Sequence, residues 1–285
     1  TMEKVTTKWD WLLLKVNITN VTVHNAKEGD LLFAASEIIS TVDTLATLSA
    51  FTLKFKSLLL RNPNLVLDCN VATSNTWSQI SLAAVFKILS TQKKVIVENG
   101  ALRLHGEYGA DLPFKNVKID FRQSGEHNYY IVAMGKIPGK IQPEFVFAAK
   151  YYGDLENYAQ SKLDFALKTS NVSLVEILKF IPNYKQNFMQ GDFADLDIHG
   201  SIQNGVLDKI SSDFTVEKLS LSDGTYLAGG IGHIEYTPQN HASSFSFKDL
   251  SVGNDAWFSQ PIIIDAISGG LDLQQNEQQW AITGK

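Results

Sequence analysis

The sequence predicts a mainly β protein, folded as a long, curved and largely antiparallel open sheet whose apolar side forms a groove, with two or three short helices. Three observations lead to this fold class. Apolar and polar residues alternate in short segments along the whole chain. Turn-forming dipeptides separate neighbouring segments. Charged residues make up only 19% of the chain, below the usual quarter of a soluble protein, so apolar surface is abundant.

The alternation has a period of two residues, which is the period of a strand with one apolar and one wet face. In residues 51–56, Phe, Leu and Phe alternate with Thr, Lys and Lys. Residues 117–122, 163–168, 196–199 and 245–248 repeat the pattern. About 17 such segments occur, well above the five or six strands of an average sheet. The chain is therefore expected to be built mainly from strands.

Turn signals lie between the alternating segments. Asn99-Gly100, Asn204-Gly205 and Asp223-Gly224 are typical of two-residue hairpin turns. Residues 62–64 and 125–128 also have turn compositions. Because short turns join antiparallel neighbours, we expect an antiparallel meander.

Three segments depart from the strand pattern. Residues 78–90 have the spacing of a short amphipathic helix. Residues 173–181 predict a second helix, with Ser173 as its cap, Glu176 at the capping-box position and Pro182 after the last turn. A further short helical turn is expected near Asp43.

A single curved sheet with one apolar face leaves that face open. At about 4.8 Å between neighbouring strands, such a sheet spans on the order of 80 Å. Large apolar patches on a monomer usually serve a function. The candidate groove residues are Leu53, Phe55, Ile119, Phe121, Phe145, Phe147, Leu163, Phe165, Leu196, Ile198, Phe245 and Phe247. The alternative for each of them is ordinary core packing, with the helices at 78–90 and 173–181 covering the sheet.

Several function classes are disfavoured by the sequence. The formal net charge is −5 and there is no Lys/Arg cluster, so a nucleic-acid partner is not expected. The histidines lack the spacing of a zinc site, and Gly-x-Ser-x-Gly is absent. The glycines at 229–232 lack the helix of a dinucleotide site and predict a bend. Asp195 and Asp197 are expected on the wet face of a strand. We expect no enzyme activity, cofactor or metal.

Two stretches resemble a known family. Residues 28–38 through 60–67 resemble the N-terminal module of AsmA-like proteins, in which a strand leads to a small helix and then to a strand that ends in a Pro-centred turn. Residues 177–182, followed by the Gly-flanked alternating strand 191–202, resemble the YhdP branch of that family. These motifs are packing patterns and contain no catalytic signature.

The resemblance implies a fragment of a longer protein that lines a chorein-like β-groove, with an N-terminal module at 1–92 and a groove extension at 93–285. It also implies a periplasmic location in a Gram-negative bacterium and an inner-membrane anchor outside this chain. Phospholipids would move along the groove between the inner and outer membranes. A structural or interaction domain of the envelope, without a lipid conduit, is the alternative. Partner proteins in the envelope stay unassigned.

Overall fold

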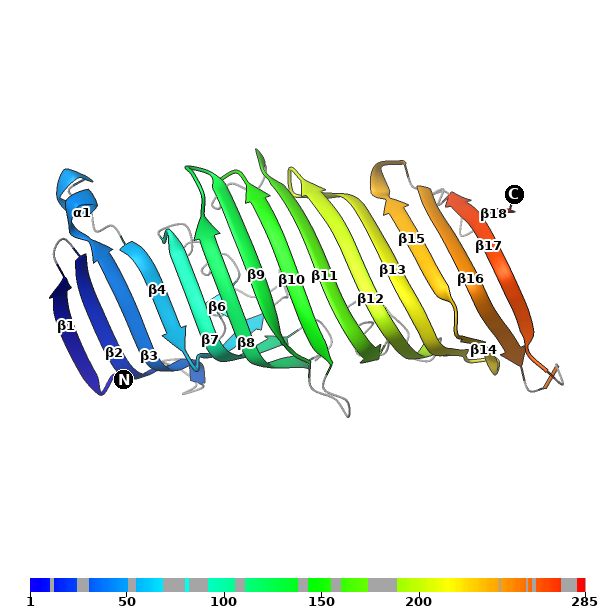
Figure 1. Ribbon diagram of the computed structural model, residues 1–285, viewed down its shortest axis with the longest axis horizontal. Coiled ribbons are helices and arrows are strands. Elements are labelled where there is room, and N and C mark those ends of the chain that lie inside the picture. Colours follow the sequence, from blue (N-terminus) through cyan, green and yellow to red (C-terminus); the bar gives the residue numbers. More distant parts are fainter. Residues whose placement is uncertain are drawn as a thin grey trace. The chain divides into compact units, whose positions relative to one another are not determined.

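The computed structural model describes residues 1–10, 13–24, 31–50, 55–68, 80–81, 92–105, 111–137, 143–154, 160–173, 189–240, 242–254, 256–257, 260–272 and 281–284. These residues are mainly β-strand and include almost no helix. The strands form a curved, open sheet, so the predicted fold class is confirmed (Figure 1). The chain divides into unit 1, Thr1–Tyr158, and unit 2, Ala159–Lys285. Each unit is described separately below.

The described residues of unit 1 form one helix and the first ten strands. They are β1 (Lys4–Asp10), β2 (Leu13–His24), β3 (Leu31–Asp43), α1 (Thr44–Ala50), β4 (Phe55–Arg61), β5 (Asn64–Asp68), β6 (Ile80–Ser81), β7 (Lys94–His105), β8 (Asp111–Gln123), β9 (Asn128–Lys136) and β10 (Glu144–Tyr152). Most neighbours pair antiparallel: β1 with β2, β2 with β3, β3 with β4, β7 with β8, β8 with β9, and β9 with β10.

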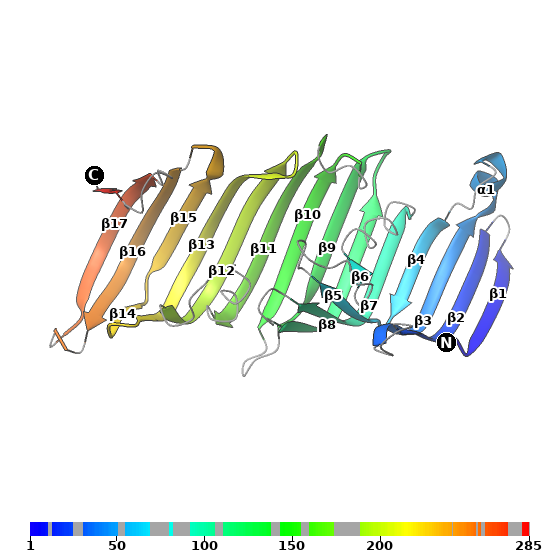
Figure 2. The ribbon, with the colours of Figure 1, turned by 180° about the vertical axis from the view of Figure 1, so that it is seen from behind.

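The meander is interrupted at β4 and β5, which both pair with β3 on one side and with β7 on the other. Residues 62–64 therefore join two collinear strands instead of reversing the chain. The pairing of β7 with β4 and β5 is parallel, as is that of β6 with β5. Figure 2 shows β5 and β6 beside β7, seen from behind. The expectation of an antiparallel meander is thus wrong at this position.

A line of asparagines with positive φ crosses the sheet of unit 1. Asn20, Asn62, Asn99 and Asn116 have φ of 51°, 46°, 55° and 52°, a conformation that Asn tolerates better than most residues. The amide of Asn99 donates to Asn62 Oδ1 at 2.9 Å, and that of Asn62 donates to Ser36 Oγ at 2.9 Å. These residues interrupt neighbouring strands at one level, where irregular pairing bends a strand.

The expected hairpin at Asn99-Gly100 is wrong. Both residues lie inside β7, where the register with β8 shifts between Val97 and Gly100. Asn favours the left-handed conformation both in type I′ turns and in bulges, so the dipeptide does not distinguish them. By contrast, the turn at residues 125–128 joins β8 to β9, as expected.

The short helix expected near Asp43 is α1. The Asp43 carboxylate accepts a hydrogen bond from the Ala46 backbone N–H at 3.0 Å, which satisfies one of the free donors at the helix start. In the segment expected as a helix at 78–90, Ile80 and Ser81 instead form β6, and the remainder lies outside the described residues.

Unit 2 contains strands that all pair antiparallel with their neighbours within the unit. They are β11 (Lys162–Ser173), β12 (Met189–Gln203), β13 (Val206–Leu221), β14 (Thr225–Ala228), β15 (Ile231–Thr237), β16 (Ala242–Asn254), β17 (Ile262–Asp272) and β18 (Ala281–Gly284), with the 3-10 turn η3 (Pro238–Asn240) between β15 and β16. The pairs follow the chain order, except that β14 and β15 both lie between β13 and β16.

The turn signals of unit 2 are confirmed. Asn204 and Gly205, with φ of 55° and 76°, close the hairpin between β12 and β13. Gly224 lies in the turn from β13 to β14, where the Asp223 carboxylate accepts a hydrogen bond from the Thr225 N–H. Gly229 and Gly230, with φ of 63° and 87°, separate β14 from β15. Figure 1 shows β14 turning sharply away from β15 at this bend.

The helix expected at residues 173–181 falls almost wholly outside the described residues. Its expected cap, Ser173, is the last residue of β11 and pairs with Asp192. Asp195 and Asp197 lie on either side of the buried Leu196 in β12. The wet-face interpretation of these two aspartates is therefore confirmed.

Candidate apolar binding face

Register places one apolar residue from each of eight strands of unit 1 in a single row. Consecutive members of this row are paired across β1, β2, β3, β4, β7, β8, β9 and β10. The row consists of Val5, Ile18, Ile38, Leu60, Val97, Ile119, Ala133 and Phe147. At about 4.8 Å per strand it extends about 34 Å across the sheet. We call the side that carries this row the apolar face of unit 1.

The parallel row two residues along each strand is nearly as apolar. It consists of Thr7, Val16, Ser40, Leu58, Val95, Phe121, Ile131 and Ala149. The register of each strand pair therefore places the apolar residues of one strand beside the apolar residues of the next, on the same side of the sheet. The result is a two-dimensional apolar surface.

The β7–β9 part of this face is closely packed. Phe121 is 1% exposed and forms a buried cluster with Val95 and Tyr129. The rings of Phe121 and Tyr129 stack with centroids 5.7 Å apart. Burial in this cluster, followed by the nearby Asp154 carboxylate and Tyr151, raises the pKa of the Tyr129 hydroxyl above 10.0, so the phenol stays neutral. This part of the face serves as a core.

The face becomes open toward β1. Val5 is 50% exposed and Trp9 is 66% exposed, although both alternate with polar residues and lie on the apolar face. Within the described residues no second layer of strands or helices covers them. Exposed side chains of this size leave apolar area available to a ligand.

Unit 2 has a corresponding apolar face. One register row contains Leu167, Ile198, Ser212, Ile234, Phe245 and Gly269, and the next contains Thr169, Leu196, Phe214, Gly232, Phe247 and Ile267. Leu196 and Phe214 are buried, whereas Ile234 is 40% exposed and Ile267 is 44% exposed. This face also combines packed and open positions.

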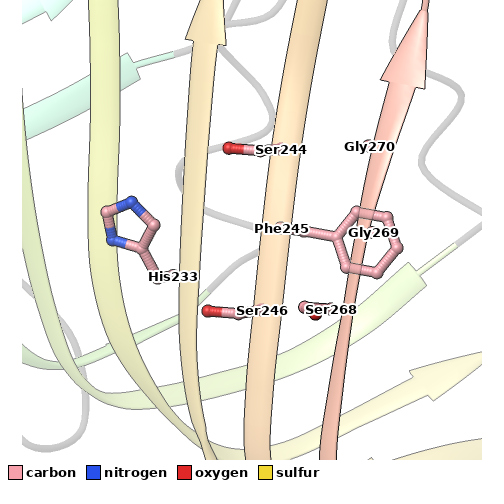
Figure 3. Close-up of a pocket in the computed structure, with 7 residues that line it drawn as sticks. All are labelled: His233, Ser244, Phe245, Ser246, Ser268, Gly269 and Gly270. Carbon is pink, nitrogen blue, oxygen red and sulfur yellow. The ribbon is translucent and has the colours of Figure 1, made fainter. Parts of the chain in front are cut away.

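Aromatic rings on the apolar faces lie over glycines of the adjacent strand. A Cβ added at Gly200 would lie 2.3 Å from the Phe165 ring, and one added at Gly232 would lie 2.4 Å from the Phe214 ring. Phe245 covers Gly269 in the same manner (Figure 3). Each ring thus lies along the sheet, and it shields backbone that a glycine leaves bare. A layer of flat rings is thinner than a layer of upright side chains.

All described candidates from the sequence lie on the apolar face of their unit. In unit 1 these are Phe55, Ile119, Phe121, Phe145 and Phe147, and in unit 2 they are Leu163, Phe165, Leu196, Ile198, Phe245 and Phe247. Leu53 lies outside the described residues. Phe121, Phe145 and Leu196 are buried, which is the core-packing role weighed as the alternative for each candidate.

Sequence reasoning missed several members of the face, namely the exposed Trp9, Ile234 and Ile267 and the half-buried Ile18. It also missed the glycines beneath the aromatic rings. The alternation around Ile234 contained a usable signal, since His233 and Glu235 flank it. A glycine gives no such signal, because its role depends on which aromatic residue lies opposite in the neighbouring strand.

A polar site lies on the other side of unit 2. Asp213, His233, Ser246 and Ser268 are consecutive register partners on β13, β15, β16 and β17, and Asp213 Oδ1 lies 2.7 Å from His233 Nδ1. The order of these residue types resembles a hydrolase triad. However, Figure 3 shows the His233 ring directed away from Ser246, and the geometry lacks the base–nucleophile contact that such chemistry uses. In the described residues no group of three or more His, Cys, Asp or Glu side chains could hold a metal.

None of the helices among the described residues is long and apolar enough to cross a bilayer. Comparisons with protein-family models, curated proteins and solved structures find no match to this chain.

Proposed function

We propose that the apolar faces bind the acyl chains of phospholipids and form part of a conduit for lipid transfer. The observation that carries this proposal is the uninterrupted row of eight apolar residues across unit 1. Its length of about 34 Å exceeds one leaflet of a bilayer, about 15 Å of hydrocarbon. An acyl chain therefore fits along the row with room to move between strands.

The energetic argument is the cost of exposing a lipid tail to water. Each CH₂ group costs about 0.8 kcal/mol when it leaves an apolar environment, so a whole acyl chain does not cross water readily. A continuous apolar face removes most of this cost at every position along the path. Binding of this kind needs no nucleophile, metal or cofactor, and we propose a non-enzymatic role.

The resemblance to AsmA-like proteins of the YhdP branch supports a specific setting. In this setting the chain belongs to the periplasm of a Gram-negative bacterium, where an inner-membrane anchor outside this chain holds it and phospholipid passes between the inner and outer membranes. The alternative, a structural or interaction domain of the envelope, requires that the protein's own segments cover the apolar faces.

The first experiment is native mass spectrometry and lipid extraction of the protein purified from a bacterial host. We expect phospholipid in near-stoichiometric or greater amounts. A clean unliganded mass, together with no uptake of fluorescent phospholipid, would favour the covered structural domain.

A matched pair of variants on β15 tests the location. Ile234 lies on the apolar face and is 40% exposed, whereas Ile231 lies on the opposite face of the same strand and is 59% exposed. Because both positions are open, Ile234→Asp and Ile231→Asp should both fold. We expect only Ile234→Asp to lower the bound lipid. Equal lipid content in the two variants would contradict binding at this face.

A further inference from the structure

Helix α1 presents leucines to solvent. Leu45 is 56% exposed and Leu48 is 70% exposed, and residues three apart lie on the same side of a helix. The opposite side of α1 contains the half-buried Ala46 and Thr47. The helix therefore directs its largest apolar side chains away from the sheet.

An exposed tryptophan lies at the same end of the strands. β1 ends at Asp10, which pairs with Leu13 of β2, and Leu13 pairs with Asp43 immediately before α1. Trp9 is the adjacent residue and is 66% exposed. Figure 1 shows α1 beside the ends of β1 and β2. Leu45, Leu48 and Trp9 form what we call the apolar tip of unit 1.

Basic residues accompany the apolar tip on the opposite side of the sheet. Lys8 pairs with Lys15, and farther along the sheet Lys94 pairs with Arg122. These residues belong to one row of positions across the sheet, which contains Lys8, Lys15, Thr41, Ser57, Lys94, Arg122, Tyr130 and Lys150. Ser57 and Lys94 are neighbours in this row because the residues that follow them, Leu58 and Val95, are register partners. We call these positions the basic row. It contains no acidic residue.

Three acidic groups lie near this row, and one of them, Asp120, is paired with a basic residue of the row. Asp120 is engaged with Arg122 through two hydrogen bonds, and the Asp43 carboxylate caps α1. Asp10 is exposed at the strand end. Lys8 and Lys15 are both exposed and form no ion pair with any residue in the described part of the chain. Their charges are therefore available to a partner.

The charge of the chain is divided unequally between its units. Unit 1 contains 17 Lys and Arg against 15 Asp and Glu, whereas unit 2 contains 8 against 15. Unit 1 is therefore weakly positive and unit 2 strongly negative. An anionic surface attracts unit 1 and repels unit 2, which favours contact through unit 1.

We propose that the apolar tip and the Lys8–Lys15 end of the basic row dock unit 1 on a phospholipid bilayer that contains anionic lipids. A bilayer that meets these strand ends contacts Trp9 and the α1 leucines, which enter the interface, while the lysines reach headgroup phosphates. Tryptophan is enriched at this depth, and lysines near an anionic leaflet are attracted to it. This inference goes beyond the proposed function, because it holds whether or not acyl chains occupy the apolar face.

Sedimentation with vesicles tests the docking on the full chain. We expect the protein to co-sediment with vesicles of phosphatidylcholine and phosphatidylglycerol, more weakly at high salt, and far less with phosphatidylcholine alone. Because each lysine at an anionic surface contributes about fivefold in affinity, Lys8→Gln should weaken binding by about that factor. The matched control is Lys4→Gln, at the other end of β1, which should leave binding unchanged.

A second variant pair tests insertion. Leu45→Ser with Leu48→Ser should weaken binding by about tenfold or more, since each leucine loses its burial in the interface. The control is Val23→Ser, a 45% exposed valine at the other end of β2. Absence of sedimentation, equal binding to both vesicle types, or equal effects of Lys4→Gln and Lys8→Gln would overturn the docking. Lipid content of the purified protein, measured on the same samples, reports separately on the proposed function.

Discussion

The ring of Phe165 lies over Gly200, its register partner on the neighbouring strand, so closely that a Cβ at position 200 would lie 2.3 Å from the ring. The same relationship links Phe245 to Gly269 and Phe145 to Gly135. Glycine in a strand is normally a weakness, because it packs nothing and gains entropy on unfolding. At these positions it makes room for an aromatic ring, which restores the lost apolar contact.

Two adjacent glycines of β17 test this relationship. A Cβ at Gly269 would lie 2.7 Å from the Phe245 ring, whereas a Cβ at Gly270 would have only the Ser243 carbonyl oxygen nearby, at 3.6 Å. Gly269→Ala should therefore lower the free energy of unfolding by about 1–3 kcal/mol through overpacking. Gly270→Ala should leave it unchanged or raise it by about 0.5 kcal/mol, because alanine restricts the unfolded chain. Urea unfolding of both variants measures the difference, and equal values would contradict the packing role of Gly269.

The apolar face of unit 1 combines core and open positions, and substitutions should separate them. Phe121 is 1% exposed, so Phe121→Ala should cost about 3–5 kcal/mol of stability. Val5 is 50% exposed on β1, so Val5→Ala should cost less than about 1 kcal/mol. Urea unfolding checks both values. A small loss for Phe121→Ala would mean that the buried cluster does not hold the sheet together.

The line of positive-φ asparagines makes a separate prediction. Asn99 has φ of 55° inside β7 and donates its amide to Asn62. Asn99→Ala should cost about 1–2 kcal/mol, because alanine is strained in the left-handed region and cannot make the hydrogen bond. Asn99→Gly should cost less than Asn99→Ala, because glycine adopts this φ freely. Thermal unfolding measures the stability of both variants. A lower unfolding temperature for Asn99→Gly than for Asn99→Ala would contradict the conformational argument.

The strands of this protein follow from local alternation, and so does the identity of the apolar face. Ile119 and Phe121 alternate with Lys118 and Asp120, and any pairing that buries one apolar face places both residues on it. The hairpin at Asn204-Gly205 likewise depends on residues that are adjacent in sequence. These features were predictable because the physics that produces them acts over a few residues.

Long-range pairing was not predictable in the same way. The parallel contact between β4 and β7 joins segments separated by a long connection, and no local pattern indicates it. Asn99-Gly100 has the same composition as a hairpin turn, yet its position opposite the Asn62 break makes it a bulge. The degree to which Phe121 is buried also depends on neighbours from other strands. In each case the deciding contact comes from a residue distant in sequence.

Glu37 forms a charged network near the part of the line of positive-φ asparagines that runs from Asn20 to Asn62. The contacts of this carboxylate predict how the stability of the fold depends on pH. Glu37 Oε1 accepts a hydrogen bond from Asn17 at 2.7 Å, and Glu37 Oε2 accepts one from Arg61 at 2.6 Å. The Asn17 hydrogen bond first, and then the Arg61 hydrogen bond, hold the pKa of Glu37 below its ordinary value of 4.5. A carboxylate whose pKa is lower in the folded state stabilises the fold above its unfolded-state pKa. That contribution is lost as the pH falls through the folded-state pKa.

Glu37→Gln should therefore lower the urea midpoint near neutral pH, and this deficit relative to the unsubstituted protein should shrink as the pH falls below about 4.5. Asn17→Ala removes the hydrogen bond with the largest effect on the carboxylate, so it should also flatten the acid limb of the stability curve while leaving the Arg61 contact in place. Urea unfolding over a pH series measures both effects. A deficit for Glu37→Gln that stays constant across the acid range would show that the carboxylate titrates alike in the folded and unfolded chains.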